Sequence, residues 1–550
     1  MALSAYAIWE VRSLGSDNNS GGFDPDATMK STLSSSNGTS STPTVTASDY
    51  TFVSGDIGYY LYIKSGTSWT PGWYLITSIS SGSAVVNAAS GQFIKANSVL
   101  SSSNGIGSTN SLSSGTWTID YSQNNSARVS FTDLYLNSTT TCSSVANPIT
   151  SAMIGNTIRV ISGSGFTPGV YVINSTSGTI ATLDRAAGTS LSSNGVANLG
   201  GAFGTAYTGL SSSIYLNSYG TIYIKADATY EVYGLSILYG GSSSPHIVGY
   251  GTYRTDKQRP VFSMTGPNTS VFRRWDGTFT KMSNIEFNGN NNISSYAFAF
   301  TNNQPYSTMT NCIFKNMTGS YGSGIQTRFC VHDNAPGAGY VYDYCIFVNK
   351  PNFINVMNYN LGLFTNSIVY KNFVGNDFTW QNSDQISYGM IKNNIIHELN
   401  GGGYFVGTYN NCAGGLPSQN EATTFVMNNI VSEINGFTVR TVCGYAPQPF
   451  LLDTNAYYLN RGGAGTTAYN SYANDKYIGV NEIFLTKSPF RNANNGDFTL
   501  NDDIGGGKEV RYDSTPITLL DTNTKQNKDL GPYQGKNPPI RTNMNGGMRG

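Results

Sequence analysis

The sequence predicts an all-β protein: a right-handed parallel β-helix over residues 204–500, preceded by two small, related antiparallel β modules. Three observations lead to this prediction. A short apolar phrase recurs through the second half, the first 203 residues carry a two-fold repeat, and no stretch of useful length has the period of a helix. Charged residues make up only 11% of the 550, against about 25% in ordinary globular proteins.

The recurring phrase has an Asn, Cys or Ser, then Ile and a second apolar residue, with an Asn shortly after. Its Ile stands at positions 285, 313, 346, 368, 395 and 430. Successive Ile residues are therefore 22 to 35 residues apart. A sequence period of this length is typical of stacked repeats, whose equivalent strands lie about 4.8 Å apart. Strand neighbours face opposite sides, so either Ile313 or Phe314 faces the core. The other would pack under a loop or against another subunit.

The two-fold repeat defines modules at residues 1–100 and 101–203. Ile57-Gly58 and Thr70-Pro71-Gly72 return 97 residues later as Ile154-Gly155 and Thr167-Pro168-Gly169. Alternating apolar residues between these Pro-Gly turns indicate short antiparallel hairpins. After the β-helix, a Gly- and Pro-rich tail at residues 501–550 is expected to cap the last repeat or to dock on a partner.

Charge and leader features narrow the function classes. There are 31 basic and 31 acidic residues, so no broad field attracts nucleic acid, and we expect no such partner. No segment approaches the ~18 continuous apolar residues of a membrane span, so membrane insertion is not expected. The N-terminus has neither a basic start nor an apolar run, which predicts synthesis in a cytoplasm without a secretory signal.

Cysteines and histidines give no metal pattern. None of the six Cys forms a CxxC pair, and the three His are scattered, so we predict no metal and no cofactor. Cys312 and Cys345 occupy the same phase of successive repeats. Their Cα atoms would fall within disulfide range, but a cytoplasmic origin favours reduced, stacked thiols.

Two sets of phrases carry a family resemblance. The segment from His246 to Arg254, an apolar strand running into a Gly-Tyr turn, resembles the first coils of the pectate-lyase-like β-helix superfamily. Together with the opening Trp9 to Arg12, the repeated Thr-Pro-Gly turns and the stretch from Ala181 to Gly188, the chain is similar to virion proteins of tailed bacteriophages. The resemblance implies a place on the virion surface as a tail fibre, tailspike or capsid decoration protein. It also implies a homotrimer and contacts with other virion proteins.

Glu398 and Glu433 are the first candidate for chemistry. Each stands three residues after the repeated Ile, so the two would stack near the ~5 to 5.5 Å of a retaining carboxylate pair. The alternative is a pair of solvated charges at the rim of the solenoid. The loop at residues 401–421 would also separate them.

Asp377, Trp380 and Asp384 form a second candidate, in a loop between repeats. An aromatic ring flanked by acids would stack on a sugar and bind carbohydrate. Alternatively, Trp380 packs under the loop and the two Asp cap turns. A third candidate is His332-Asp333 with Asp343, although such a pair is more often a local hydrogen bond. The catalytic motifs of pectate lyases are absent at matching positions, so no catalytic residue is carried over.

The leading hypothesis is a non-enzymatic virion structural protein that presents a rigid surface for assembly or host binding. One alternative is a tailspike-type glycosidase or lyase acting on host surface polysaccharide, with Glu398 and Glu433 as its weak catalytic candidates. The other is a bacterial surface adhesin.

Overall fold

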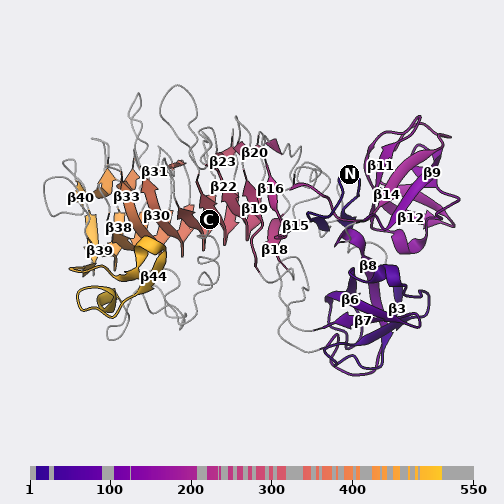
Figure 1. Ribbon diagram of the computed structural model, residues 1–550, viewed down its shortest axis with the longest axis horizontal. Coiled ribbons are helices and arrows are strands. Elements are labelled where there is room, and N and C mark those ends of the chain that lie inside the picture. The colour runs from indigo at the N-terminus through magenta and orange to yellow at the C-terminus, as the bar shows by residue number, and fades with distance from the viewer. Residues whose placement is uncertain are drawn as a thin grey trace. The chain divides into compact units, whose positions relative to one another are not determined.

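The computed structural model is all-β, with long parallel sheets and two small antiparallel barrels of six strands each (Figure 1). Its chain divides into two compact units. The first contains residues 1–231, 237–262 and 283–285, and the second contains 232–236, 263–282 and 286–550. The described residues are 8–23, 30–88, 105–123, 126–206, 220–232, 235–236, 246–251, 257–263, 270–274, 280–290, 296–300, 306–316, 339–348, 355–357, 362–373, 379–381, 389–400, 404–408, 424–433, 437–441, 450–458, 469–470, 477–480 and 483–510.

The N-terminal region contains two closed antiparallel barrels, which confirms the predicted pair of related antiparallel modules; the first barrel extends to β8, beyond residue 100. The first barrel has the order β3-β4-β7-β6-β5-β8 and the second has β10-β13-β12-β11-β14-β9. Their strands are β3 (Lys30–Ser35), β4 (Thr44–Ala47), β5 (Tyr60–Ser65), β6 (Gly72–Ser80), β7 (Ser83–Asn87), β8 (Leu112–Asp120), β9 (Val129–Ser138), β10 (Thr141–Ser143), β11 (Thr157–Ser162), β12 (Gly169–Ser177), β13 (Ile180–Leu183) and β14 (Gly195–Leu199). Single 3₁₀ turns accompany them: η1 (Ser54–Asp56), η2 (Tyr121–Gln123) and η3 (Ser151–Met153).

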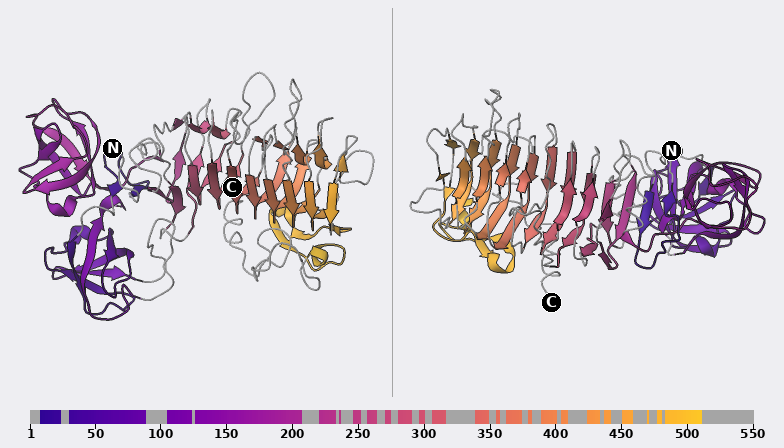
Figure 2. Two further views of the ribbon diagram at one scale, coloured as in Figure 1. Left: turned by 180° about the vertical axis from the view of Figure 1, so that it is seen from behind. Right: turned by 90° about the horizontal axis from the view of Figure 1, so that it is seen from above.

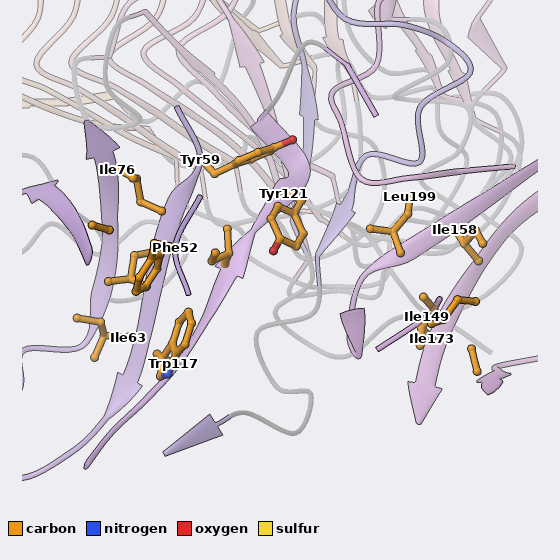
Figure 3. Packing of buried hydrophobic residues seen from close by; sticks show 14 of the residues in the cluster. Phe52, Tyr59, Ile63, Ile76, Trp117, Tyr121, Ile149, Ile158, Ile173 and Leu199 are labelled. Atoms are coloured by element: carbon orange, nitrogen blue, oxygen red, sulfur yellow. The ribbon is translucent and has the colours of Figure 1, made fainter. Parts of the chain in front are cut away.

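The barrels repeat one another in detail. Tyr74 Oη donates to Thr70 O at 2.7 Å, and Tyr171 Oη donates to Thr167 O at the same distance. Both barrel interiors belong to one buried apolar cluster, shown in Figure 3 with Trp117 in the first barrel. The sequence repeat is therefore a duplicated barrel, in which each copy needs the same tyrosine to close its Thr-Pro-Gly turn.

The N-terminal strand lies in a parallel sheet and in neither barrel. β1 (Ile8–Val11) pairs in parallel with β15 (Thr221–Lys225), which pairs with β18 (His246–Tyr250). β2 (Gly22–Phe23) lies antiparallel on the other edge of β1. The buried Trp9 packs edge-on against Phe203, with ring centroids 5.4 Å apart.

One face of this sheet carries an aromatic interface with the first barrel. Tyr62 and Trp73 of the barrel stack with ring centroids 4.3 Å apart and join one buried cluster with Tyr223 and Val248. On the same face, Glu10 is fully buried and accepts hydrogen bonds from Arg12 Nε, at 3.1 Å, and from Tyr250 Oη. The first barrel is therefore anchored on the sheet by aromatic packing.

The second unit consists of parallel strands that follow one another in chain order, as the colour sequence of Figures 1 and 2 shows. One sheet has the strands β21 (Thr280–Ser283), β24 (Tyr306–Thr310), β26 (Gly339–Asp343), β29 (Gly362–Thr365), β32 (Gly389–Lys392), β35 (Thr424–Met427), β38 (Phe450–Asp453) and β41 (Tyr477–Val480). A second has β22 (Glu286–Asn288), β25 (Ile313–Lys315), β27 (Ile346–Val348), β30 (Ile368–Phe373), β33 (Ile395–Asn400), β36 (Ile430–Ser432), β39 (Ala456–Tyr458) and β42 (Ile483–Phe484).

Shorter strands complete the arrangement. β16 (Thr229–Glu231) and β19 (Val261–Ser263) are neighbours in sheet order. Small parallel groups are formed by β17 (Leu235–Ser236), β20 (Ser270–Arg274) and β23 (Tyr296–Phe300), by β28 (Asn355–Met357) and β31 (Thr379–Gln381), and by β34 (Tyr404–Thr408), β37 (Phe437–Thr441) and β40 (Tyr469–Asn470). A C-terminal hairpin, β43 (Phe490–Asn492) and β44 (Asp497–Leu500), is accompanied by η5 (Ala493–Asn495) and η6 (Gly507–Val510).

The register of the second sheet shows which repeated residue faces the core. Phe287, Phe314 and Phe347 stack with ring centroids 5.1 and 4.9 Å apart. Phe347 also contacts Phe364 of the first sheet at 5.8 Å. The second apolar residue of each phrase therefore points between the two sheets.

The preceding residue of each phrase forms a column on the opposite face, which we call the isoleucine column. Its members pair directly from strand to strand: Ile313, Ile346, Ile368, Ile395, Ile430, Ala456 and Ile483. Ile285 does not belong to it, contrary to the spacing-based alignment, because Glu286 pairs with Ile313. Ile285 instead occupies the corner position of Cys312, where an Ile displaces the usual small or polar residue and shifts the phrase by one.

The isoleucine column is covered by the chain's own C-terminal segment, residues 485–510. Phe490, Phe498 and Leu500 of this segment share one buried cluster with Ile368 and Ile395. Each of these five side chains is at most 4% exposed. From the sequence, we expected a loop or another subunit to cover this face. The cover is a C-terminal segment of the same chain.

At the corners between the two sheets, a residue with left-handed backbone is followed by a buried residue. On three successive strands this buried residue is an Asn, and the Asn side chains are hydrogen-bonded to one another. Asn393 and Asn428 have φ of 59° and 54°, a conformation that Asn tolerates. The next residues form the asparagine ladder, Asn394, Asn429 and Asn455, all fully buried. Each Nδ2 of the first two donates to the next Oδ1, at 3.0 and 2.9 Å. The ladder thus satisfies buried corner polar groups without water.

We predict that Ile368→Asp destabilises the second unit by several kcal/mol, because it buries a carboxylate in the isoleucine column. Thermal unfolding would measure the loss. The matched control is Ile504→Asp, since Ile504 is 70% exposed. An unchanged melting temperature for Ile368→Asp would contradict the burial of this column.

We predict that Asn429→Leu costs about 3 kcal/mol, since it orphans buried partners on both neighbouring strands at roughly 1–3 kcal/mol each. Asn429→Ser should cost less, because Ser367 occupies the same corner position and donates to Thr365 O at 2.8 Å. Equal melting temperatures for the two variants would argue against stabilisation by the hydrogen bonds of the ladder.

Candidate functional site

Glu398 and Glu433 occupy the same position on successive strands. They directly follow His397 and Ser432, which are register partners in β33 and β36. Neighbouring strands of a sheet lie about 4.8 Å apart, so the two Glu backbones are close together. The register therefore places the backbones of two glutamates, 35 residues apart in the sequence, at equivalent positions on neighbouring strands.

The local backbone at both positions is left-handed. Glu398 has φ of 56° and Glu433 has φ of 55°. A residue with a Cβ pays about 1–2 kcal/mol for this conformation, and Glu lacks the short side chain that lets Asn offset it. At Glu398 the carboxylate atom Oε2 is also buried and accepts no hydrogen bond. Two strained glutamates at equivalent positions of neighbouring strands are unusual and direct attention to this site.

Side-chain and backbone contacts surround Glu398 and Glu433. His397 is fully buried, and its Nδ1 lies 2.9 Å from Ser432 Oγ. Glu433 N donates to Tyr458 O at 2.8 Å, which fixes the turn on the next strand. Chemically, adjacent carboxylates would serve as acid and nucleophile toward a glycosidic bond, or as two acceptors for sugar hydroxyls.

Of the other sequence candidates, the structure describes Trp380 and Asp343. Trp380 lies in β31, where it is the register partner of Val356. Asp377 and Asp384, like His332 and Asp333, lie outside the described residues. The predicted carbohydrate-binding group of Asp377, Trp380 and Asp384 therefore stays a prediction.

Asp343 serves as a corner acceptor. Its Oδ1 accepts from Thr365 Oγ1 at 2.9 Å and from Asn366 Nδ2 at 2.8 Å. These bonds tie two successive strands together at a corner. Its role in the structure is therefore that of a turn-stabilising carboxylate.

The described thiols are unsuited to nucleophilic chemistry. Cys142, Cys312 and Cys345 are free and fully buried. Burial raises the pKa of Cys142 to about 12 and raises the pKa of Cys345 as well, so neither forms a thiolate at neutral pH. In the described part of the chain, no group of three His, Cys, Asp or Glu residues is placed to hold a metal ion. The helical turns in that part are also too short to cross a membrane.

A buried ion pair that the sequence did not reveal joins the two barrels. Asp56, fully buried, accepts from Tyr50 Oη at 2.9 Å, from Val53 N at 2.9 Å and from Arg128 Nη2 at 3.1 Å. Arg128 also lies over the ring of Tyr121, 5.1 Å from its centroid. Burial, together with the neighbouring charges, raises the pKa of Tyr50. These bonds connect the first barrel to the chain that leads into the second.

We predict that Glu398→Asn raises the stability of the second unit by about 1 kcal/mol, because Asn tolerates left-handed backbone and the buried carboxylate oxygen is removed. The matched control is Asn428→Glu, which places Glu at a left-handed corner and should lower the melting temperature. A fall in the melting temperature of Glu398→Asn would show that the carboxylate makes a stabilising contact at this turn.

Comparison with known proteins adds little to this picture. No family model matches the chain, and no curated protein matches it. Among solved structures, the catalytic domain of a GH87 alpha-1,3-glucanase in complex with nigerose is similar at 10% identity with a TM-score of 0.17. The match covers 77% of this chain and 99% of that domain. A similarity of this size supports no conclusion about the fold or the activity of the chain.

Proposed function

We propose that the chain is a non-enzymatic structural protein of a virus particle, whose parallel sheets form a right-handed β-helix. In this proposal the β-helix is a rigid surface for particle assembly or for binding the host surface. The observation that carries it is the sealing of the isoleucine column by residues 485–510. A shaft with this face closed and its corners bonded resists opening.

Rigidity has a specific physical source. Each strand of the second sheet bonds to the strand before it and the strand after it, in unbroken register from Ile313 to Ile483. The asparagine ladder repeats the same connection at the corners. Bending the stack would have to break backbone and side-chain hydrogen bonds together, which suits a rigid part of a particle.

Self-association, as a homotrimer, is part of the proposal. The first sheet carries a register column of Val341, Leu363, Met390 and Phe425 on the face opposite the buried Tyr342 and Phe364. These four side chains are half-buried and apolar. A second copy of the chain, or another virion protein, would gain burial by covering them.

A second candidate function is cleavage or binding of host surface polysaccharide. The observation that favours it is the pair of left-handed glutamates, Glu398 and Glu433, on successive strands. Strained, partly buried carboxylates concentrate at sites where chemistry is done. An adhesin role would use the same surface without cleavage.

The test combines sedimentation of the purified chain with a cleavage assay on host capsular polysaccharide. We expect a trimer at micromolar concentration and no release of sugar fragments. A monomer at that concentration would contradict the homotrimer. Fragment release by the native chain that is lost in Glu398→Gln and Glu433→Gln, with melting temperatures unchanged, would overturn the structural proposal in favour of the enzyme.

A further inference from the structure

The C-terminal segment 485–510 is held on the isoleucine column chiefly by apolar contact. Phe490 and Phe498 lie with ring centroids 5.1 Å apart at 86°, and Phe498 lies edge-on to Tyr370 at 5.0 Å. The hairpin bond from Asn501 Nδ2 to Ser488 O at 2.7 Å is internal to the segment, whereas Leu485 N donates to Tyr457 O of the sheet at 2.8 Å where the segment begins. The burial of these rings therefore contributes to keeping the segment in place.

A histidine lies in the middle of this contact. The His397 ring is 0% exposed, and its centroid lies 6.0 Å from Phe490 and 5.6 Å from Phe498, both edge-on. Its Nδ1 lies 2.9 Å from Ser432 Oγ on the neighbouring strand. His397 is thus in contact with the sheet on one side and with the hairpin on the other.

The protonation state of this ring matters to the contact. A neutral imidazole fits between phenyl rings and a hydroxyl, whereas an imidazolium buried there would lose its hydration. When the segment is released, the ring faces water and titrates near its ordinary value of ~6.5. Because the closed form excludes the proton, its stability is complete above ~6.5 and falls as the pH drops below that value.

The other ionisable groups around His397 come from the neighbouring strands and from the hairpin. Burial raises the pKa of Tyr370 to about 12, so its hydroxyl is neutral throughout. Lys371 and Glu398 follow Tyr370 and His397 on their strands, and Glu433 follows Ser432. The hairpin contributes Arg491, paired with Asp502 at 4.0 Å, and the exposed Asp497.

We infer that His397 makes the C-terminal segment 485–510 a pH-sensitive cover, which opens on mild acidification and exposes the isoleucine column. The sheet beneath keeps its backbone bonds, so opening converts a sealed face into an apolar one. This inference concerns regulation and does not depend on whether the chain cleaves polysaccharide.

Hydrogen exchange of residues 490–500, read by mass spectrometry at pH 7.5 and 5.5 and corrected for the intrinsic rate, tests the inference on the full chain. In the native protein we expect the opening equilibrium to rise by up to about tenfold, the limit for one proton bound over the unit of pH below ~6.5. His397→Gln, which is never charged, should show no such rise even if its hairpin is looser at both pH values.

Two further variants make the outcome decisive. Glu398→Gln should keep the rise, because it leaves the imidazole unchanged. His397→Met, an apolar replacement, should abolish the rise and serves if His397→Gln does not fold. A rise that persists without His397, or that disappears with Glu398→Gln, would overturn the inference. So would a native protein whose protection is the same at both pH values.

Discussion

The structure of the second unit depends on one constraint, the in-register pairing of each parallel strand with the strand one repeat earlier. Pairing of Ile313 with Ile346, and of Ile346 with Ile368, places every later residue of the phrase by counting. The aromatic stack, the isoleucine column and the asparagine ladder all result from this one register. A slip of one residue would exchange the two apolar columns and break the ladder at once.

This dependence on strand register explains which features could be predicted from the sequence and which could not. Repeated Ile residues predicted the strands, and the Thr-Pro-Gly repeat predicted the paired antiparallel modules, because both are local patterns. The misplacement of Ile285 shows the limit: with an Ile at the corner, the phrase fits two alignments one residue apart. Only pairing between Glu286 and Ile313 distinguishes them. The cover over Ile368 was also inaccessible, since Phe498 lies 130 residues away along the chain.

The candidate site could also be predicted only in part. Spacing alone indicated that Glu398 and Glu433 fall at equivalent positions. It did not indicate their left-handed backbone, nor that one carboxylate oxygen is buried, because both depend on how the corner closes. The buried pair of Asp56 and Arg128 was equally hidden. Its partners are 72 residues apart, and neither stands in a motif.

The pairing of β1 with β15 has a consequence for synthesis. Ile8 is made before its partner Thr221, which follows only after about 210 further residues. At roughly 5–20 residues per second, Trp9 waits about 10–40 s for the strand that buries it. Both barrels are complete before then, so they fold while joined to an unfinished neighbour. Strand β1 is thus made before both barrels but placed only after them, and segment 485–510 is placed later still.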